Sequence, residues 1–229
     1  MDPVAPFEIF LAAPPGLEPL LRDEAAALGL SGPRTLPGGV AVAGGWPEVW
    51  RANLRLRGAT RVLARIAGFR VLHLAQLDKR ARKVAWAETL RPDVPVRIDV
   101  TTRKSRVYHA GAARERIATA IRETLAAPVV DAGSDDAPGE AVTLKVRIDN
   151  DLCAISVDTS GEPLHRRGHK QAVNAAPMRE TMAALFLAAC GYRGDEPVYD
   201  PMCGSGTFPI EAAEIAADLA PGRSRSFAF

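Results

Sequence analysis

The sequence lacks long hydrophobic runs, paired cysteines and a high aromatic content, and each shortage excludes a class of protein. It has no run of about 18 apolar residues, and no basic patch and apolar stretch follow Met1, so we expect neither a membrane span nor a secretory signal. Cys153, Cys190 and Cys203 show no CxxC spacing, which argues against a disulfide framework and a zinc site. We therefore expect a cytoplasmic protein without a metal centre.

Charge is unevenly distributed along the 229 residues, although the formal net charge is only +2. Residues 1–50, 51–125 and 126–229 carry formal charges of −4, +12 and −6. A concentrated positive charge favours a polyanionic partner, because each neutralised phosphate releases counterions; a solvated helix face is the alternative. Aromatic residues make up only 6%, so we expect structured RNA read by backbone and shape rather than a stacking platform for single strands.

Candidate phosphate contacts lie in three places. One group is on the outer side of a predicted helix, a second is in the loop after a predicted strand, and a third, Arg166-Arg167, is in a linker. The linker pair has two open interpretations: contact with RNA or cofactor, or simple solvation of the linker. The predicted RNA-binding residues are Lys79, Arg80, Arg82, Lys83, Arg103, Lys104, Arg106, Arg166 and Arg167.

The spacing of apolar residues predicts a mixed α+β chain. Val96, Ile98 and Val100 alternate with polar residues, as in a strand with one buried face. Polar, turn-rich residues 131–139 predict a loop. By such criteria, strands are predicted at 7–11, 40–42, 61–72, 96–101, 142–148, 153–157 and 197–200, and helices at 17–28, 47–54, 74–84, 117–125, 177–189 and 207–219. Gly191 is placed to end the helix that Pro177 opens.

The most informative segment is the glycine-rich turn Asp200-Pro201-Met202-Cys203-Gly204-Ser205-Gly206-Thr207, between a predicted buried strand and a predicted helix. Glycines without Cβ atoms let the backbone approach a ligand, and the start of the following helix offers free N–H groups. The turn therefore predicts a site for a nucleotide-like cofactor.

Three familiar motifs do not fit this turn. A Walker loop needs a lysine after Gly206, and a dinucleotide fingerprint needs glycine where Pro209 stands. A serine-hydrolase elbow needs glycine in place of Cys203. Phosphate cradling, dinucleotide binding and serine hydrolysis are therefore disfavoured.

The turn resembles the cofactor loop of class I methyltransferases that modify the exocyclic amine of guanine in RNA. Residues 158–168 and 176–181 are similar to the segment that precedes their Rossmann-like domain. Arg61–Leu63, Arg103–His109 and the hairpin at 142–157 resemble a THUMP domain, and the first fifty residues resemble its ferredoxin-like companion. The resemblance covers essentially the whole chain and points to the bacterial 23S rRNA guanine-N2 methyltransferases.

This resemblance implies an α+β fold, with a ferredoxin-like subdomain at 1–55 and a THUMP RNA-binding domain at 56–159. A linker and the truncated start of an α/β Rossmann-like methyltransferase domain would occupy 160–229. The implied activity is methyl transfer from S-adenosylmethionine to the N2 amine of a guanine in rRNA. The implied cofactor-binding residues are Pro177, Glu180, Asp200, Pro201, Met202, Cys203, Gly204, Gly206 and Thr207.

The chain departs from the family in one respect. The acidic residue that holds the ribose and the Asn-Pro-Pro-Tyr motif that positions the guanine amine have no counterpart up to Phe229. We therefore expect no catalytic residue in this chain and no catalysis by it alone. The alternative is a stand-alone RNA-binding module with a vestigial methyltransferase segment.

Simpler interpretations accompany three of the candidates. Cys203 has no neighbouring His or Lys to activate it, so plain packing is favoured over a reactive thiol. His165 and His169 have the spacing of helical metal ligands, but Pro163 and Gly168 favour a loop. Asp200 could cap a strand end, although its place before the glycines favours contact with a cofactor.

Overall fold

The computed structural model describes residues 6–130, 141–168 and 177–229. They form two compact units, one of residues 1–62 with 162–227 and one of 63–161 with 228–229. The first unit therefore combines the start of the chain with the region of the glycine-rich turn. The predicted boundaries at 55 and 159 remain predictions.

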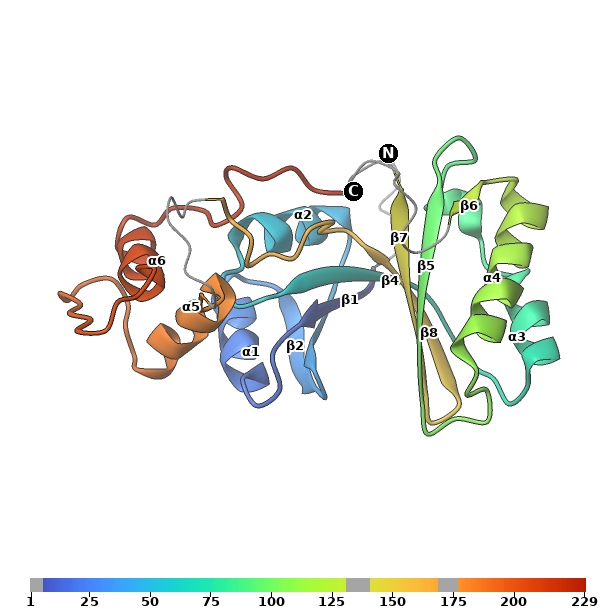
Figure 1. The fold of residues 1–229 in the computed structure, drawn as a ribbon, viewed down its shortest axis with the longest axis horizontal. Helices are drawn as coiled ribbons and strands as arrows, with labels where there is room; N and C mark the ends of the chain where they lie inside the picture. The colour runs from blue at the N-terminus through green and yellow to red at the C-terminus, as the bar shows by residue number, and fades with distance from the viewer. Residues whose placement is uncertain (1–5, 131–140, 169–176) are drawn as a thin grey trace. The chain divides into compact units, whose positions relative to one another are not determined.

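The first unit contains an antiparallel sheet with strand order β2-β3-β1, shown in blue in Figure 1. Alternation buries Ile9 and Leu11 of β1, and the Leu21 face of α1 is buried as well. The elements are β1 (Phe7–Ala12), α1 (Glu18–Ala27), β2 (Ser31–Leu36), β3 (Gly39–Gly44), α2 (Trp46–Arg55), α5 (Glu180–Ala189) and α6 (Thr207–Ala216).

Glycines end two helices of this unit. Gly29 follows α1 with φ +74°, and the N–H of Leu30 donates to the carbonyl of Ala25 at 3.0 Å. Gly191, predicted to end the helix that starts near Pro177, follows α5 with φ +81°. Left-handed backbone of this kind lets the last carbonyls of a helix find donors. The prediction for Gly191 is confirmed.

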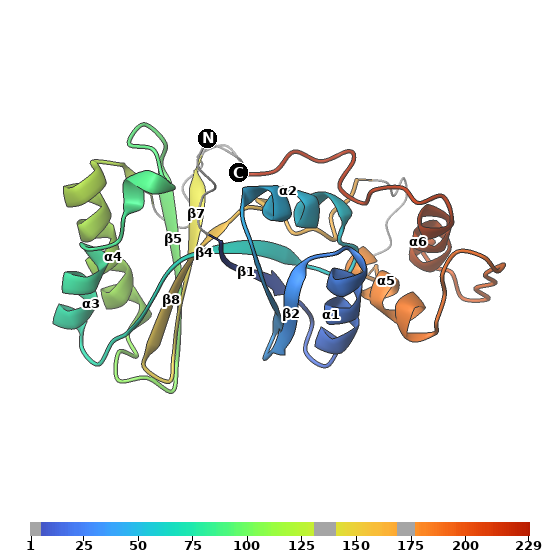
Figure 2. The same cartoon turned by 180° about the vertical axis from the view of Figure 1, so that it is seen from behind.

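The second unit is a mixed sheet with strand order β4-β8-β7-β5-β6. Leu144, Val146 and Ile148 on β7 are buried, as are Ile155 and Val157 on β8. Helices α3 and α4 pack against each other and lie together on one side of this sheet in Figures 1 and 2. The elements are β4 (Arg61–Arg70), α3 (Leu74–Ala81), a 3-10 turn (Trp86–Glu88), β5 (Val96–Arg103), α4 (Ala110–Leu125), β6 (Val129–Val130), β7 (Val142–Asp149) and β8 (Leu152–Asp158).

The predicted hairpin at 142–157 is confirmed, with Asp149 paired to Leu152 across a turn in which Asn150 and Asp151 have positive φ. The predicted loop at 131–139 lies outside the described residues. In the described ranges every helix is too short or too polar to span a bilayer.

Candidate functional site

The glycine-rich turn leads directly into α6. The Asp200 Oδ1 accepts a hydrogen bond from the Met202 backbone N–H at 2.9 Å, and the Gly206 N–H donates to the Cys203 carbonyl at 2.7 Å. Gly204 and Gly206 have φ values of +54° and +73°, in the left-handed region where glycine is favoured. The predicted passage from turn to helix is confirmed.

The strand predicted at Pro197–Asp200 is wrong. This segment has no assigned strand, and Tyr199 is 89% exposed. A strand needs a neighbour that accepts and donates its ladder hydrogen bonds, and no described strand pairs with this segment. Its apolar residues are those of a strand, but its backbone is a loop.

The start of α6 is open to a ligand. Gly206 is its N-cap and has no side chain to cap the helix. The first N–H groups of a helix lack partners within it and attract anionic or polar groups. Cys203 is exposed, so the interpretation of this residue as a packed side chain is wrong. Met202 is also exposed, at 88%. The turn thus presents backbone and side chains outward.

The segment from Pro177 to Glu180 lies beside the start of α6. The Thr207 hydroxyl donates to the Met178 carbonyl at 3.4 Å, and the rings of Phe186 and Phe208 are 6.4 Å apart. The structure therefore brings the two predicted parts of the cofactor site together. A cavity of about 410 Å³ is lined by residues 165–168 and 177–180 of this region.

The cavity lining carries three arginines, Arg166, Arg167 and Arg179, and one acid, Glu180. Arg166 and Arg179 are exposed on its lining, and Arg166 pairs with Glu162 at 2.5 Å. Burial, and then the charge of Arg179, lowers the pKa of His165, so its imidazole stays neutral at neutral pH. His169 lies outside the described residues. Among the described residues no His, Cys, Asp and Glu side chains gather as a metal site requires.

Arg167 is not placed as an RNA contact. Its side chain is 2% exposed, and it pairs with the buried carboxylate of Glu211 on α6. A buried guanidinium with a carboxylate partner is out of reach of a phosphate, so Arg167 is not an RNA contact. Because the side chain is also shielded from water, its interpretation as a solvated linker residue is wrong as well. Arg166, its neighbour, is exposed as an RNA contact requires.

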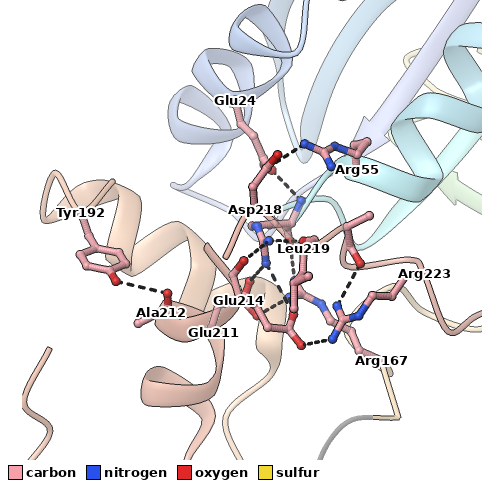
Figure 3. Close-up of polar contacts among 12 residues, drawn as sticks. Glu24, Arg55, Arg167, Tyr192, Glu211, Ala212, Glu214, Asp218, Leu219 and Arg223 are labelled. Carbon is pink, nitrogen blue, oxygen red and sulfur yellow. Dashed lines mark hydrogen bonds and ion pairs between the residues drawn. The ribbon is translucent and has the colours of Figure 1, made fainter. Parts of the chain in front are cut away.

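Arg167 belongs to an ion network that our sequence analysis missed. Its other members include Arg57, Glu211, Glu214 and Arg223, and Figure 3 shows the acids of α6 facing Arg167 and Arg223. The signal was present, because Glu211 and Glu214 are three residues apart on an otherwise apolar helix and so share one face.

Arg103 ends β5, and Lys104 and Arg106 lie in the loop after it; all three are exposed. Hydrogen bonds fix the backbone of this loop. The Ser105 hydroxyl donates to the Arg103 carbonyl at 2.7 Å and accepts from the Asp151 N–H at 3.0 Å. Asp151 also accepts from the Arg106 N–H at 2.8 Å. Three cationic side chains are thus displayed on a fixed backbone.

A further basic residue was missed at this edge of the sheet. Exposed Arg70 ends β4 in register with Leu152, while Arg103 ends β5 in register with Asp149. Since Asp149 and Leu152 flank one turn, both strands end at the same edge. We call Arg70, Arg103, Lys104 and Arg106 the basic edge. The parallel course of β4 and β5 was the signal that could have found Arg70.

The basic residues predicted on α3 are less uniform. Lys79, Arg80 and Lys83 are exposed. Arg82 instead pairs with Asp78 at 2.9 Å and with Glu123 of α4, and these partners raise the pKa of Arg82. Arg80 also lies over the Phe69 ring, 5.9 Å from its centroid. Arg82 thus links the two helices, while its neighbours are free to meet solvent or a partner.

Two family models match parts of the chain. Residues 8–63 match the RlmL ferredoxin-like domain. Residues 167–229, which contain the glycine-rich turn and α6, match the RMKL-like methyltransferase domain.

A curated relative and two solved structures resemble the chain over most of its length. The ribosomal RNA large subunit methyltransferase K/L of Syntrophotalea carbinolica is 36% identical over 97% of this chain and 32% of its own. A predicted N6-adenine-specific DNA methylase from Listeria monocytogenes has a TM-score of 0.88 and 32% identity over 97% of this chain and 58% of its own. The putative methyltransferase SMU.472, solved in complex with SAH, has a TM-score of 0.83 and 27% identity over 99% of this chain and 60% of its own. The chain thus spans about a third of the relative and three fifths of the structures.

Proposed function

We propose that this chain is part of an S-adenosylmethionine-dependent RNA methyltransferase of the RlmL type, acting on the N2 amine of a guanine in 23S rRNA in the cytoplasm. The observation that carries the proposal is the glycine-rich turn opening the uncapped helix α6, within the residues that match a methyltransferase domain. The ferredoxin-like match at residues 8–63 supports the same family.

The residues around the turn fit a nucleoside cofactor. Two glycines in left-handed conformation expose backbone, and at the start of α6 N–H groups that no carbonyl of the helix accepts are offered to a polar group of the ligand. One carboxylate oxygen of Asp200 is fixed by the Met202 N–H, and we assign the other oxygen to the cofactor. Pro177 to Glu180 would cover the cofactor from the other side. SMU.472, solved with SAH, supports S-adenosylmethionine as the ligand.

Bound S-adenosylmethionine supplies a methyl group on a sulfonium, which an amine displaces in line without a covalent enzyme intermediate. The task of the protein is therefore alignment and exclusion of water. In this chain the turn and α6 would fix the position of the cofactor. No residue described here is assigned to the guanine amine.

RNA would be held by the second unit. Arg166, in the first unit, is assigned one phosphate contact, and the others are assigned to the basic edge and to Lys79, Arg80 and Lys83 on α3 of the second unit. This unit would serve as the THUMP RNA-binding domain. Phosphate contacts fix the register of a nucleic acid without reading its sequence, so they suit a domain that delivers structured RNA to a separate site.

The direct test is to map methylated nucleotides in rRNA from cells that lack the whole gene. The proposal predicts the loss of one or more N2-methylguanines in 23S rRNA and their return when the gene is restored. Because one similar structure is that of a predicted DNA methylase, adenine methylation of genomic DNA is measured in parallel. Unchanged methylation of the rRNA, together with a loss of N6-methyladenine from genomic DNA, would overturn the RNA assignment.

A further inference from the structure

Helix α6, which begins at the cofactor turn, is bound by arginine side chains from other parts of the chain. The carboxylate of Glu211 is 2% exposed and accepts a hydrogen bond from Arg57 on Oε1 at 2.8 Å. Its other oxygen accepts from Arg167. Both oxygens of a buried acid are thus satisfied by guanidinium groups, and Arg57 lies in the segment that matches the ferredoxin-like domain.

Arg57 also reaches the other end of α6. Its second terminal nitrogen donates to the Glu214 carbonyl at 3.1 Å and to the Leu219 carbonyl just beyond the helix. The last carbonyls of a helix lack partners within it and carry partial negative charge, so a cation there is favourable. One guanidinium therefore binds a side chain in the middle of α6 and the backbone at its end.

The backbone that carries Arg57 is itself fixed. Glu24 of α1 accepts hydrogen bonds from the N–H groups of Arg57 at 2.6 Å and Gly58 at 3.0 Å. Arg167 donates to the Arg57 carbonyl at 2.9 Å. A Cβ atom at Gly58 would lie 2.4 Å from Leu185 Cδ2, so the turn packs tightly on α5. Arg57 thus extends from a rigid part of the ferredoxin-like region.

Such a network is better suited to specifying one arrangement than to adding stability. Buried ion pairs gain little net free energy over apolar packing, while removing one partner leaves an uncompensated buried charge and is strongly destabilising. A slip of α6 by one residue would rotate it by about 100° and move it about 1.5 Å, and would break every bond to Arg57. Apolar contacts alone would tolerate such a slip more easily.

We propose that Arg57 is a positioning residue for the cofactor turn. By fixing the rotation and the axial position of α6, it sets the place of Gly206 and Thr207 and hence the shape of the site. The ferredoxin-like region would then govern cofactor affinity without touching the cofactor. This inference rests on the proposed function for its ligand, but not for its geometry.

The test compares Arg57→Met and Arg57→Lys with the matched control Arg55→Ala in the whole chain. Arg57→Lys keeps a cation for Glu211 but loses the bonds to the two carbonyls. Among the residues that the structure describes, Arg55 pairs with Asp218 at 2.8 Å, in an exposed ion pair beside the same network. Three quantities are measured: amide hydrogen exchange of residues 203–212, the Kd for S-adenosylhomocysteine, and the urea midpoint of unfolding.

We expect Arg57→Met to speed exchange at Gly206 and at residues 210–212, whose amides donate hydrogen bonds within the turn and α6, at least about tenfold under native conditions. We expect the same substitution to raise the Kd for S-adenosylhomocysteine about two- to thirtyfold. Arg57→Lys should show smaller changes of the same kind, and Arg55→Ala none. Both effects should persist at temperatures where each variant is fully folded, which a residue that only adds stability would not produce.

Unchanged exchange at Gly206 and at residues 210–212 in either Arg57 variant would overturn the inference. The inference would also be overturned if an Arg57 variant had a lower urea midpoint of unfolding but an unchanged Kd for S-adenosylhomocysteine. If Arg57→Met does not fold, Arg57→Lys decides by the same criteria. If the wild-type chain does not bind S-adenosylhomocysteine, the proposed cofactor is at fault, and hydrogen exchange still decides whether Arg57 positions the turn.

Discussion

The three cysteines occupy different environments. Cys153 on β8 is fully buried, and this burial raises the pKa of its thiol to about 12. Cys190 and Cys203 are exposed. Since the thiolate is the reactive form, Cys153 should be inert in the folded chain. We predict that iodoacetamide at about pH 8 labels Cys190 and Cys203 but labels Cys153 only in denaturant, as peptide mass spectrometry can show. Labelling of Cys153 as fast as that of Cys190 would contradict this placement.

His165 links the folded state to pH. Because burial lowers its pKa below the usual 6.5, the folded chain binds this proton less tightly than the unfolded chain. Its contribution to stability is therefore complete above pH 6.5 and is lost as the pH falls toward the folded pKa. We predict that the urea midpoint of the wild type falls more than that of His165→Gln between about pH 7.5 and about pH 5.5. Equal falls in the two proteins would exclude this linkage.

At the level of elements, tight packing of the turn at Gly58 joins α1 to α5. An added Cβ would lie 2.4 Å from Leu185 Cδ2, 2.9 Å from Leu185 Cγ and 3.0 Å from Glu24 Oε2. We predict that Gly58→Ala lowers the free energy of unfolding by about 1–3 kcal/mol. The matched control is Gly68→Ala on β4, where no atom lies within 4 Å of the new Cβ. A Gly58→Ala variant as stable as this control in urea would show that the turn is loosely packed.

The elements that could be predicted from the sequence are those whose pattern is local. Alternation in Val142–Asp149 and helical spacing in Ala110–Leu125 come from residues that each bury one face. The strand β2 was missed because Ser31–Leu36 contains Gly32 and Pro33 and is almost wholly exposed. Pro197–Asp200 was wrongly made a strand because its residues are apolar, whereas strand formation depends on a pairing partner.

The candidate site divides in the same way. The turn at Asp200–Thr207 is contiguous, so its glycines and the helix after it were visible in the sequence. The pairing of Arg57 with Glu211 joins residues 154 positions apart, and no local pattern specifies it. For the same reason the burial of Arg167 was missed, since a charged residue between Arg166 and Gly168 is ordinarily solvated.

For the molecule as a whole, RNA binding should depend on the basic edge. Arg103→Ala, Lys104→Ala and Arg106→Ala together remove three exposed cations without changing buried residues. We predict that the triple variant binds structured RNA more weakly and that the slope of log K against log salt falls by about 2 to 3, or about 0.7–0.9 per lost phosphate contact. The matched control Arg91→Ala, an exposed cation paired with Asp93, should leave the slope unchanged. Equal slopes in wild type and triple variant would remove the basic edge from the RNA surface.

The central claim is that the turn from Asp200 to Thr207 holds S-adenosylmethionine. It is tested most directly by titrating the isotope-labelled chain with S-adenosylhomocysteine and following each backbone amide by NMR. We expect saturable shifts at Met202–Thr207 and Met178–Glu180, and none at Arg103–Arg106 in the other unit. Saturable shifts elsewhere with none at the turn, or no shifts at millimolar ligand, would contradict it.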